Sequence, residues 1–184
     1  GYPLRHSVKV LVAIATLSLT GPASIPMSVT PPRLVLESFL PYRLNVLAEV
    51  VSQSLSRLYS KRYGLSVAEW RVIATLGQYD RMTATAICAH SHMHKTKVSR
   101  AVTALADRGL VARATNAKDL REAILMLTAD GRGVYDEFVP EATAFAEGLT
   151  EGLGEAERAL IETTITRLIE RSEALAADLA GDRP

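Results

Sequence analysis

The fold is decided by residues 94–121, which read HKTKVSRAVTALADRGLVARATNAKDLR. Apolar residues recur here at the i, i+3, i+4 and i+7 spacing of one helical face, which predicts an amphipathic helix. These residues are Val98, Ala101, Val102 and Leu105. Gly109 stands where a glycine commonly ends such a helix. A short strand and a polar loop are expected to follow it.

Positive charge is concentrated in the same stretch. It holds seven Lys and Arg residues against two Asp residues, although the whole 184-residue chain has a formal net charge of +1. Residues 122–184 hold fourteen acidic and five basic residues. A helix and loop that concentrate positive charge in this way are suited to bind a polyanion. The acidic C-terminal part is better suited to contact partner helices.

The composition is that of an ordinary globular protein, with 48% hydrophobic and 22% charged residues. The length allows one well-cored domain or two small ones. Aromatic residues make up only 5% of the chain, which argues against a single-strand binder that stacks bases on rings. Cys88 is the single cysteine, so an internal disulfide is excluded and a reducing cytoplasm is the expected location.

Residues 1–36 predict an irregular N-terminal extension. Arg5, His6 and Lys9 precede an apolar run at residues 10–19 that imitates a secretory signal but is too short to span a bilayer. Met27 is the first methionine, and we expect the native protein to begin there, so that residues 1–26 are not native. A genuine extra segment and secretion are the alternatives, and no membrane association is expected.

Helices account for most of the rest. Residues 37–63 predict a long helix with Pro41 in its first turn, and Gly64 ends it. The spacing of Ser66 and Glu69 is that of a capping box, so a second helix is expected from there to about residue 76. Thr83 is positioned to cap a short third helix that ends near residue 90.

Two apolar runs, at residues 110–113 and 122–127, predict a β-hairpin that forms a wing. Thr128 opens a fifth helix, which Pro140 is expected to kink, and a last helix covers residues 155–180. The predicted fold is therefore mainly α with a small β wing. Its segments are a dimerisation helix at 37–63, a winged helix-turn-helix domain at 64–128 and C-terminal dimerisation helices at 129–184.

The first and last predicted helices carry apolar stripes longer than a small winged domain can cover. Pairing them with the same helices of a second chain buries both stripes, which predicts a two-fold homodimer. Such a dimer presents two recognition helices to successive major grooves, about 34–36 Å apart.

The sequence resembles the MarR family of winged helix-turn-helix repressors over nearly all of residues 37–180. The resemblance is most specific at Lys118-Asp119-Leu120-Arg121, followed by a strand that ends in Leu127-Thr128 and by Gly131-Arg132. The family's wing has the same Asp-x-Arg pair before a strand ending Leu-Thr and a helix bearing Gly-Arg. Residues 96–111, TKVSRAVTALADRGLV, are similar to its recognition helix.

The resemblance implies an obligate dimer bound to a palindromic operator near its own promoter. In that interpretation Arg121 enters the minor groove, steadied by Asp119, which agrees with the attraction of arginine to a narrow, negative groove. The major groove is read by Thr96, Lys97, Ser99 and Arg100. The cations expected to contact phosphates are Lys95, Lys97, Arg113 and Lys118.

A narrower likeness rests on residues 90–102, HSHMHKTKVSRAV, with Pro41-Tyr42-Arg43-Leu44 and the EWRV segment at 69–72. These segments are similar to a branch of the family that controls degradation of plant-derived aromatic acids, some members of which respond to hydroxycinnamoyl-CoA thioesters. This likeness implies a cavity between the dimer helices and the winged domain, which would take an aromatic acid or its CoA thioester. The wall residues it implies are Tyr42, Arg43, Trp70, Arg71 and His90.

Several of these residues have other interpretations. Large aromatic residues in helices mostly pack in a core, so core packing is the first interpretation of Trp70 and ligand contact is the alternative. Cys88 is either a small buried hydrophobe or a redox sensor. His90, His92 and His94 alternate across a helix end and do not share a face, so no metal site is predicted.

No catalytic motif is recognised: the sequence has no glycine-rich phosphate loop, no His-Glu-x-x-His and no nucleophile elbow. An enzyme is therefore not predicted, and no cofactor is expected. Two alternatives to a ligand-responsive repressor stay open. One is a helical protein-interaction module without DNA binding, and the other is a regulator that senses redox state through Cys88.

Overall fold

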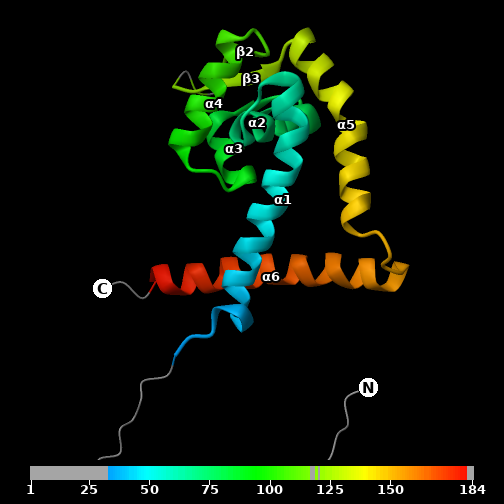
Figure 1. The fold of residues 1–184 in the computed structure, drawn as a ribbon. Coiled ribbons are helices and arrows are strands. Elements are labelled where there is room, and N and C mark those ends of the chain that lie inside the picture. The colour runs from blue at the N-terminus through cyan, green and yellow to red at the C-terminus, as the bar shows by residue number, and fades with distance from the viewer. Residues whose placement is uncertain (1–32, 117–118, 120, 182–184) are drawn as a thin grey trace, which may run out of the picture.

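The computed structural model describes residues 33–116, 119 and 121–181, so Met27 and Lys118 lie outside the described residues. The fold is mainly helical with a small antiparallel sheet, which confirms the predicted fold class (Figure 1). The elements in chain order are η1 (Leu36–Ser38), α1 (Leu40–Tyr63), α2 (Val67–Tyr79), β1 (Met82–Thr83), α3 (Ala84–Ser91), α4 (Lys95–Asp107), β2 (Val111–Thr115), β3 (Ala123–Leu127), α5 (Ala129–Leu149) and α6 (Glu155–Gly181).

The prediction that the first helix starts at residue 37 was wrong by three residues. A short 3-10 turn precedes α1, and Phe39 between them is extended, with φ −80° and ψ 107°. Pro41 explains this start, because it has no N–H to donate to the carbonyl of Glu37 and its ring would clash with that carbonyl. The predicted end is confirmed, since Gly64 adopts the left-handed conformation at φ 62°.

The capping box of α2 is confirmed at both bonds. The Ser66 hydroxyl accepts from the Glu69 N–H at 3.3 Å, and the Glu69 carboxylate accepts from the Ser66 N–H at 2.7 Å. The helix continues beyond its predicted end at residue 76, through Gly77 to Tyr79. Gly77 is used for a close approach rather than for a turn, because a Cβ there would overlap the ring of Tyr135.

The wing is a three-stranded sheet with the order β1-β3-β2. In the hairpin, Val111 pairs with Leu127 and Thr115 pairs with Ala123. The sequence did not predict β1, which pairs Met82 with Leu125. This third strand ties the hairpin to the segment before α3.

One hydrophobic core joins the three predicted segments. Tyr59 of α1, Trp70 of α2 and Phe138 of α5 form an aromatic cluster, with ring centroids 4.6 Å apart for Trp70 and Phe138 and 5.6 Å apart for the other two pairs. The same core contains the buried stripe of α4 and the apolar face of β3. Helices α1 and α5 are therefore part of the winged domain at the ends where they meet it.

Away from this core the terminal helices stand out from the domain, and α6 lies across the direction of α1 (Figure 1). No residue of α6 is buried, and Leu160, Ile165 and Ile169 are each exposed by 48% or more. Leu44, Leu47 and other apolar residues of α1 are also exposed. Within the described part of the chain, no helix has the length and apolarity needed to cross a membrane.

The break before α6 lies where the sequence predicts it. Helix α5 runs through Pro140 without interruption, and Gly148 lies inside its last turn. The chain leaves the helix at Thr150 and turns at Gly152, which has φ 81°. The start of α6 at Glu155 follows directly.

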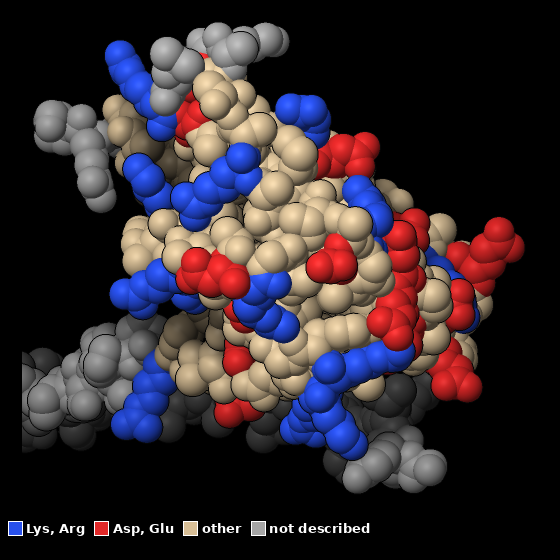
Figure 2. Space-filling view, turned by 90° about the horizontal axis from the view of Figure 1, so that it is seen from above, with Lys and Arg blue, Asp and Glu red and all other residues tan. Residues whose placement is uncertain are grey.

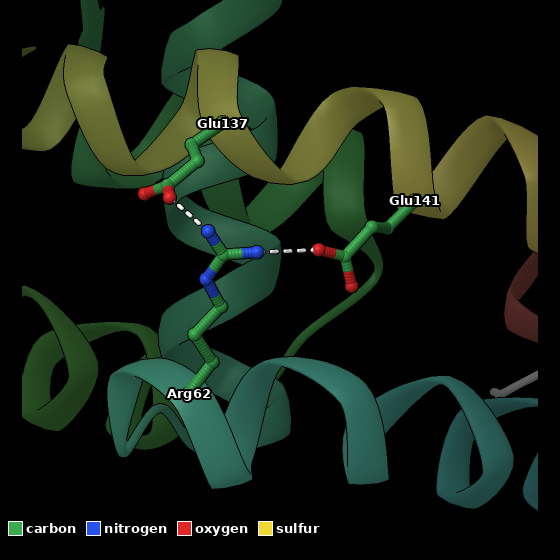
Figure 3. Close-up of polar contacts among 3 residues, drawn as sticks. All are labelled: Arg62, Glu137 and Glu141. Carbon is green, nitrogen blue, oxygen red and sulfur yellow. Dashed lines mark hydrogen bonds and ion pairs between the residues drawn. The ribbon is translucent and has the colours of Figure 1, made fainter.

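Arg62 links the last turn of α1 to the middle of α5 (Figure 3). One guanidinium nitrogen donates to Glu141 at 2.6 Å and the other to Glu137. All three side chains are roughly half exposed, at 40–52%. Exposed ion pairs contribute about 0–1 kcal/mol each, so this contact orients the two helices more than it stabilises the fold.

Gly131 gives a direct test of packing at the start of α5. A Cβ at this position would overlap the carbonyl oxygen of Leu110, whereas a Cβ at Gly133 in the same helix would meet nothing within 4 Å. We expect Gly131→Ala to lower the free energy of unfolding by about 1–3 kcal/mol. The matched Gly133→Ala should raise it by about 0.5–1 kcal/mol, because glycine is unfavourable inside a helix. Urea denaturation at fixed protein concentration measures both, and equal effects would contradict the packing argument.

Candidate nucleic-acid interface

Helix α4 is capped by the residue before it and is tied to the end of α1 by the residue after it. His94 is its N-cap, and the imidazole Nδ1 accepts from the N–H of Thr96 at 3.3 Å. At the other end, Arg108 donates to the carbonyl oxygens of Tyr63 at 2.5 Å and Gly64 at 3.4 Å. Gly109, in the left-handed region at φ 71°, ends the helix as predicted.

Helix α4 has one buried, apolar face and one exposed, polar face. The predicted apolar stripe is buried, with exposures of 0% for Val98 and Leu105, 4% for Ala101 and 3% for Val102. The opposite face is exposed and polar. It carries Lys95, Thr96, Lys97, Ser99 and Arg100, which are the residues predicted to contact DNA from this helix.

Two grooves border this exposed face. One, of about 470 Å³, lies between α4, the start of α3 and the wing, and Lys95, Ser99, Arg113 and Arg121 are among its lining residues. The other, of about 740 Å³, lies between α4 and the start of α2, and Lys97, Arg100 and Arg71 contribute to its wall. The structure therefore brings most of the predicted DNA-contacting residues to one continuous side of the molecule.

The tip of the wing is held by Asp119. Its carboxylate accepts from the backbone N–H of Arg121 at 2.9 Å, and its carbonyl oxygen accepts from the N–H of Glu122 at 3.2 Å. The resemblance to the MarR wing led us to expect that Asp119 steadies the side chain of Arg121. Among the described residues no ion pair joins the two, so Asp119 fixes the backbone and leaves the Arg121 guanidinium exposed.

Arg113 is exposed at the centre of β2, but a hydrogen bond restrains its side chain. One of its guanidinium nitrogens donates to the Thr103 hydroxyl on α4 at 3.3 Å. The sequence places Thr103 on the outward face of α4 by its helical spacing, but it does not reveal the bond to Arg113. Sequence reasoning missed Thr85 and Glu122, which form a side-chain hydrogen bond between α3 and the wing.

The charge distribution follows the same division. Seen from above, Lys and Arg side chains are most frequent on the side that carries the wing and α4, whereas Asp and Glu gather at the opposite edge, along α5 (Figure 2). A field of this asymmetry orients an approaching polyanion toward α4 and the wing.

The predicted effector-contacting residues are only partly brought together. Arg71 and His90 line one shallow pocket with Gln78 and Ser91. Tyr42 and Arg43 lie in the exposed first turn of α1. Trp70 is only 8% exposed, because it packs between Tyr59 and Phe138.

Core packing therefore accounts for Trp70, and the prediction that it lines an aromatic slot for an effector has no support in this geometry. Burial raises the pKa of the neighbouring Tyr59 phenol, and the positive charge of Arg71 partly offsets this rise. Arg71 thus lies close enough to influence the aromatic cluster while its side chain remains exposed.

The remaining candidates have structural roles. Cys88 is half-buried and packs against the core. His90 contacts the Tyr79 ring edge-on at 4.7 Å between centroids, and His92 occupies the left-handed turn before α4. In the described part of the chain, no group of three or more His, Cys, Asp or Glu residues is placed to hold a metal ion.

Comparison with known proteins agrees with this geometry. The model of the MarR family matches residues 63–122, which contain α2, the helix-turn-helix and most of the wing. A crystal structure of a MarR family regulator from Silicibacter pomeroyi DSS-3 is 29% identical, with a TM-score of 0.65 over 75% of this chain and 98% of that one. By this match the chain is assigned to the MarR family through its residues 63–122. It is a DNA-binding transcriptional regulator rather than an enzyme.

Other relatives extend the comparison. An uncharacterised HTH-type transcriptional regulator of Bacillus cereus is 24% identical over 123 residues, which cover 66% of this chain and 82% of the relative. A MarR/EmrR family regulator from Acinetobacter sp. ADP1 shares the fold with a TM-score of 0.71, at 22% identity over 77% of this MarR chain and 99% of that one.

Two further structures with this fold concern small aromatic acids. DNA binding by BpsR of Bordetella bronchiseptica is regulated by 6-hydroxynicotinic acid; it is 22% identical, with a TM-score of 0.58 over 68% of this chain and 98% of that one. NadR was solved in complex with 4-hydroxyphenylacetate; it is 21% identical, with a TM-score of 0.63 over 74% and 96%. At these identities the likeness shows the fold alone.

The role of Asp119 in the wing can be tested without DNA. Asp119→Ala removes the acceptor of the Arg121 N–H, so we expect this amide to exchange with solvent about tenfold faster, as for a hydrogen bond worth about 1 kcal/mol or more. Asp119→Asn keeps a side-chain carbonyl and should exchange nearly as slowly as the wild type. Hydrogen exchange followed by NMR measures both variants. An unchanged rate in Asp119→Ala would show that another group protects this amide.

Proposed function

We propose that this MarR protein is a homodimeric repressor that binds a palindromic operator and is released by a small aromatic acid or its CoA thioester. The observation that carries the DNA-binding part is the exposed polar face of α4, bordered on one side by the wing and on the other by the start of α2. A helix with this face suits the major groove, and the wing beside it suits the adjacent minor groove.

The exposed residues divide by chemistry. Lys95, Lys97 and Arg113 are placed to neutralise phosphates, which supplies affinity that falls as salt rises. Thr96, Ser99 and Arg100 are placed to contact base edges, where a bidentate arginine discriminates guanine. Arg121 extends the contact into the minor groove, where a narrow, negative groove attracts a guanidinium. Lys118 belongs to the same proposed set but lies outside the described residues.

The homodimer is supported by the terminal helices. The exposed apolar residues of α1 and α6 form faces that no other described element of the chain covers. Soluble proteins rarely leave such faces open, and a second copy offers the same two faces for mutual burial. Two-fold symmetry then accounts for a palindromic operator, with half-sites about 34–36 Å apart.

Arginine substitutions test the DNA contacts. We expect Arg100→Ala and Arg121→Ala each to weaken operator binding by about 5- to 150-fold, because each removes a contact worth about 1–3 kcal/mol. Arg57→Ala, which removes a like charge from the exposed surface of α1, should change affinity by less than about twofold. Fluorescence anisotropy measures the affinities on a duplex selected from a random library by the wild-type protein.

The same samples provide the control. Light scattering should give the dimer mass for all three variants, so a loss of affinity cannot be ascribed to dissociation. Lys97→Ala should weaken binding on every duplex and reduce the slope of log affinity against log salt by about 1. Equal losses for Arg57→Ala and Arg100→Ala would contradict the assignment of α4 as the recognition helix.

The effector proposal rests on surfaces around the turn before α4. An apolar groove of about 450 Å³ lies between α1 and α6, and His92 reaches it from that turn. Its lining residues include Leu44, Ile165, Leu168 and Ile169, which also belong to the apolar faces proposed for the homodimer, so the proposed effector lies at the edge of that interface. The pocket that contains Arg71 and His90 is also lined by Ser91, the residue directly before His92.

Together these surfaces offer what an aromatic acid needs, namely apolar walls for the ring and a guanidinium for the carboxylate. The binding of such acids by BpsR and NadR, which share the fold, supports the same class of effector here. A ligand held at this turn acts on DNA binding only by favouring one arrangement of α4 over another.

A thermal-shift screen of aromatic acids and their CoA thioesters tests this proposal. At a concentration about 100 times its Kd, a ligand adds about 2.7 kcal/mol of stability, which corresponds to a Tm increase of about 5–10 °C for a chain of this size. Arg71→Ala should weaken binding about tenfold, which at the same ligand concentration leaves about 1.4 kcal/mol of stabilisation and so roughly half of the Tm increase. Lys61→Ala, exposed on α1, should preserve the full increase. A full shift in Arg71→Ala would remove Arg71 from the site.

A further inference from the structure

The two strands of the wing are tied to the helix-turn-helix by different side chains. Arg113 of β2 bonds to Thr103 of α4, and Glu122, directly before β3, accepts a hydrogen bond from the Thr85 hydroxyl of α3. The second of these bonds joins residues 37 positions apart in the sequence. The wing is therefore braced against both helices of the motif rather than attached only through the sheet.

The hydrogen bond from Thr85, which we call the brace, joins the wing next to Arg121, the residue predicted to enter the minor groove. Glu122 follows Arg121 directly, and the Glu122 N–H closes the turn by donating to the carbonyl of Asp119 at 3.2 Å. The N–H of Arg121 is held by the Asp119 carboxylate at 2.9 Å. The backbone of Arg121 is thus fixed on its N-terminal side by Asp119 and on its C-terminal side by the anchored Glu122. The exposed guanidinium of Arg121 is the part of the residue that remains available to contact DNA.

The brace also controls where the Glu122 carboxylate points. Thr85 is the second residue of α3, whose first turn is capped by the Thr83 hydroxyl accepting from the Ala86 N–H at 3.1 Å. A carboxylate beside a helix N-terminus is stabilised by the helix dipole. Held there, the carboxylate faces α3 and the Thr85 hydroxyl. Without this contact, the negative charge next to Arg121 would be free to turn toward a phosphate backbone.

We propose that Thr85 and Glu122 are positioning residues that orient the wing so that Arg121 enters the minor groove. This inference rests on the proposed function, because it takes the minor-groove contact of Arg121 as given. It adds that the contact depends on a hydrogen bond from the first helix of the motif, and that neither partner of this bond needs to touch DNA. Energetic coupling between Thr85 and Arg121 is the property that separates this role from a direct contact.

A double-mutant cycle measures this coupling. Arg121→Ala should weaken binding to the selected duplex at least about tenfold in the wild-type background, but less than about threefold in Thr85→Val, which removes the donor at nearly constant volume. Thr85→Ser keeps the hydroxyl and should restore the full effect of Arg121→Ala. Circular dichroism and light scattering on each variant check that the fold and the dimer are retained.

The acceptor is tested in the same way. Glu122→Gln keeps an oxygen that can accept from Thr85 and should preserve the dependence on Arg121, whereas Glu122→Ala should reduce it as Thr85→Val does. Hydroxyl-radical footprints add a readout that a general loss of stability would not produce. In Thr85→Val and Glu122→Ala, protection should be lost in the minor groove at the ends of the site, while contacts of α4 in the major groove persist.

The outcomes separate the inference from the function on which it rests. If Thr85→Val and Arg121→Ala weaken binding additively, Thr85 contacts DNA itself and the positioning role is wrong. If Thr85→Val leaves both affinity and footprint unchanged, the brace does not position the wing. If Arg121→Ala has no effect in the wild-type background, the minor-groove role of Arg121 is wrong, and this inference is overturned with it, whereas Arg100→Ala still reports on α4.

Discussion

The burial of one stripe of α4 against α2 is the constraint on which the rest of the structure depends. Val98 and Leu105 are completely buried in the core that also holds Val72, Ile73 and Leu76. Burying each large apolar side chain contributes about 1.5–3 kcal/mol, so a rotation of α4 about its axis would cost several of these contributions at once. The polar face is thereby held outward. Its orientation is a consequence of packing on the opposite side, not of any contact that the polar residues make.

Features that arise from local sequence could be predicted well. The apolar spacing in α4, the capping box at Ser66 and the glycines at positions 64 and 109 all act within a few residues of where they stand. Deviations arise where a distant residue decides the outcome. Gly77 looks like a turn signal in the sequence, yet it lies inside α2, where its missing Cβ leaves room for the ring of Tyr135. The strand β1 has only two residues, too few to show a periodicity.

The same distinction applies to the candidate site. The concentration of positive charge on α4 and the wing follows from composition and periodicity, and the structure places those side chains on one side. The partners of these side chains do not follow from the sequence, since Arg113 meets Thr103, and Glu122 meets Thr85, only after the wing has folded back. Trp70 has two interpretations in the sequence, as a core residue and as a pocket wall, and its packing between two other rings agrees with the first.

Arg108 gives the molecule a mechanical property that its individual contacts do not suggest. Its guanidinium joins the C-terminal end of α4 to the last carbonyls of α1, so the two helices share a pivot. A helix of 13 residues extends about 20 Å from such a pivot. A tilt of about 10° would then displace the leading end of α4 by roughly 3 Å, about the length of a hydrogen bond. The position of the leading end of α4 therefore depends strongly on the angle between α4 and α1 at this contact.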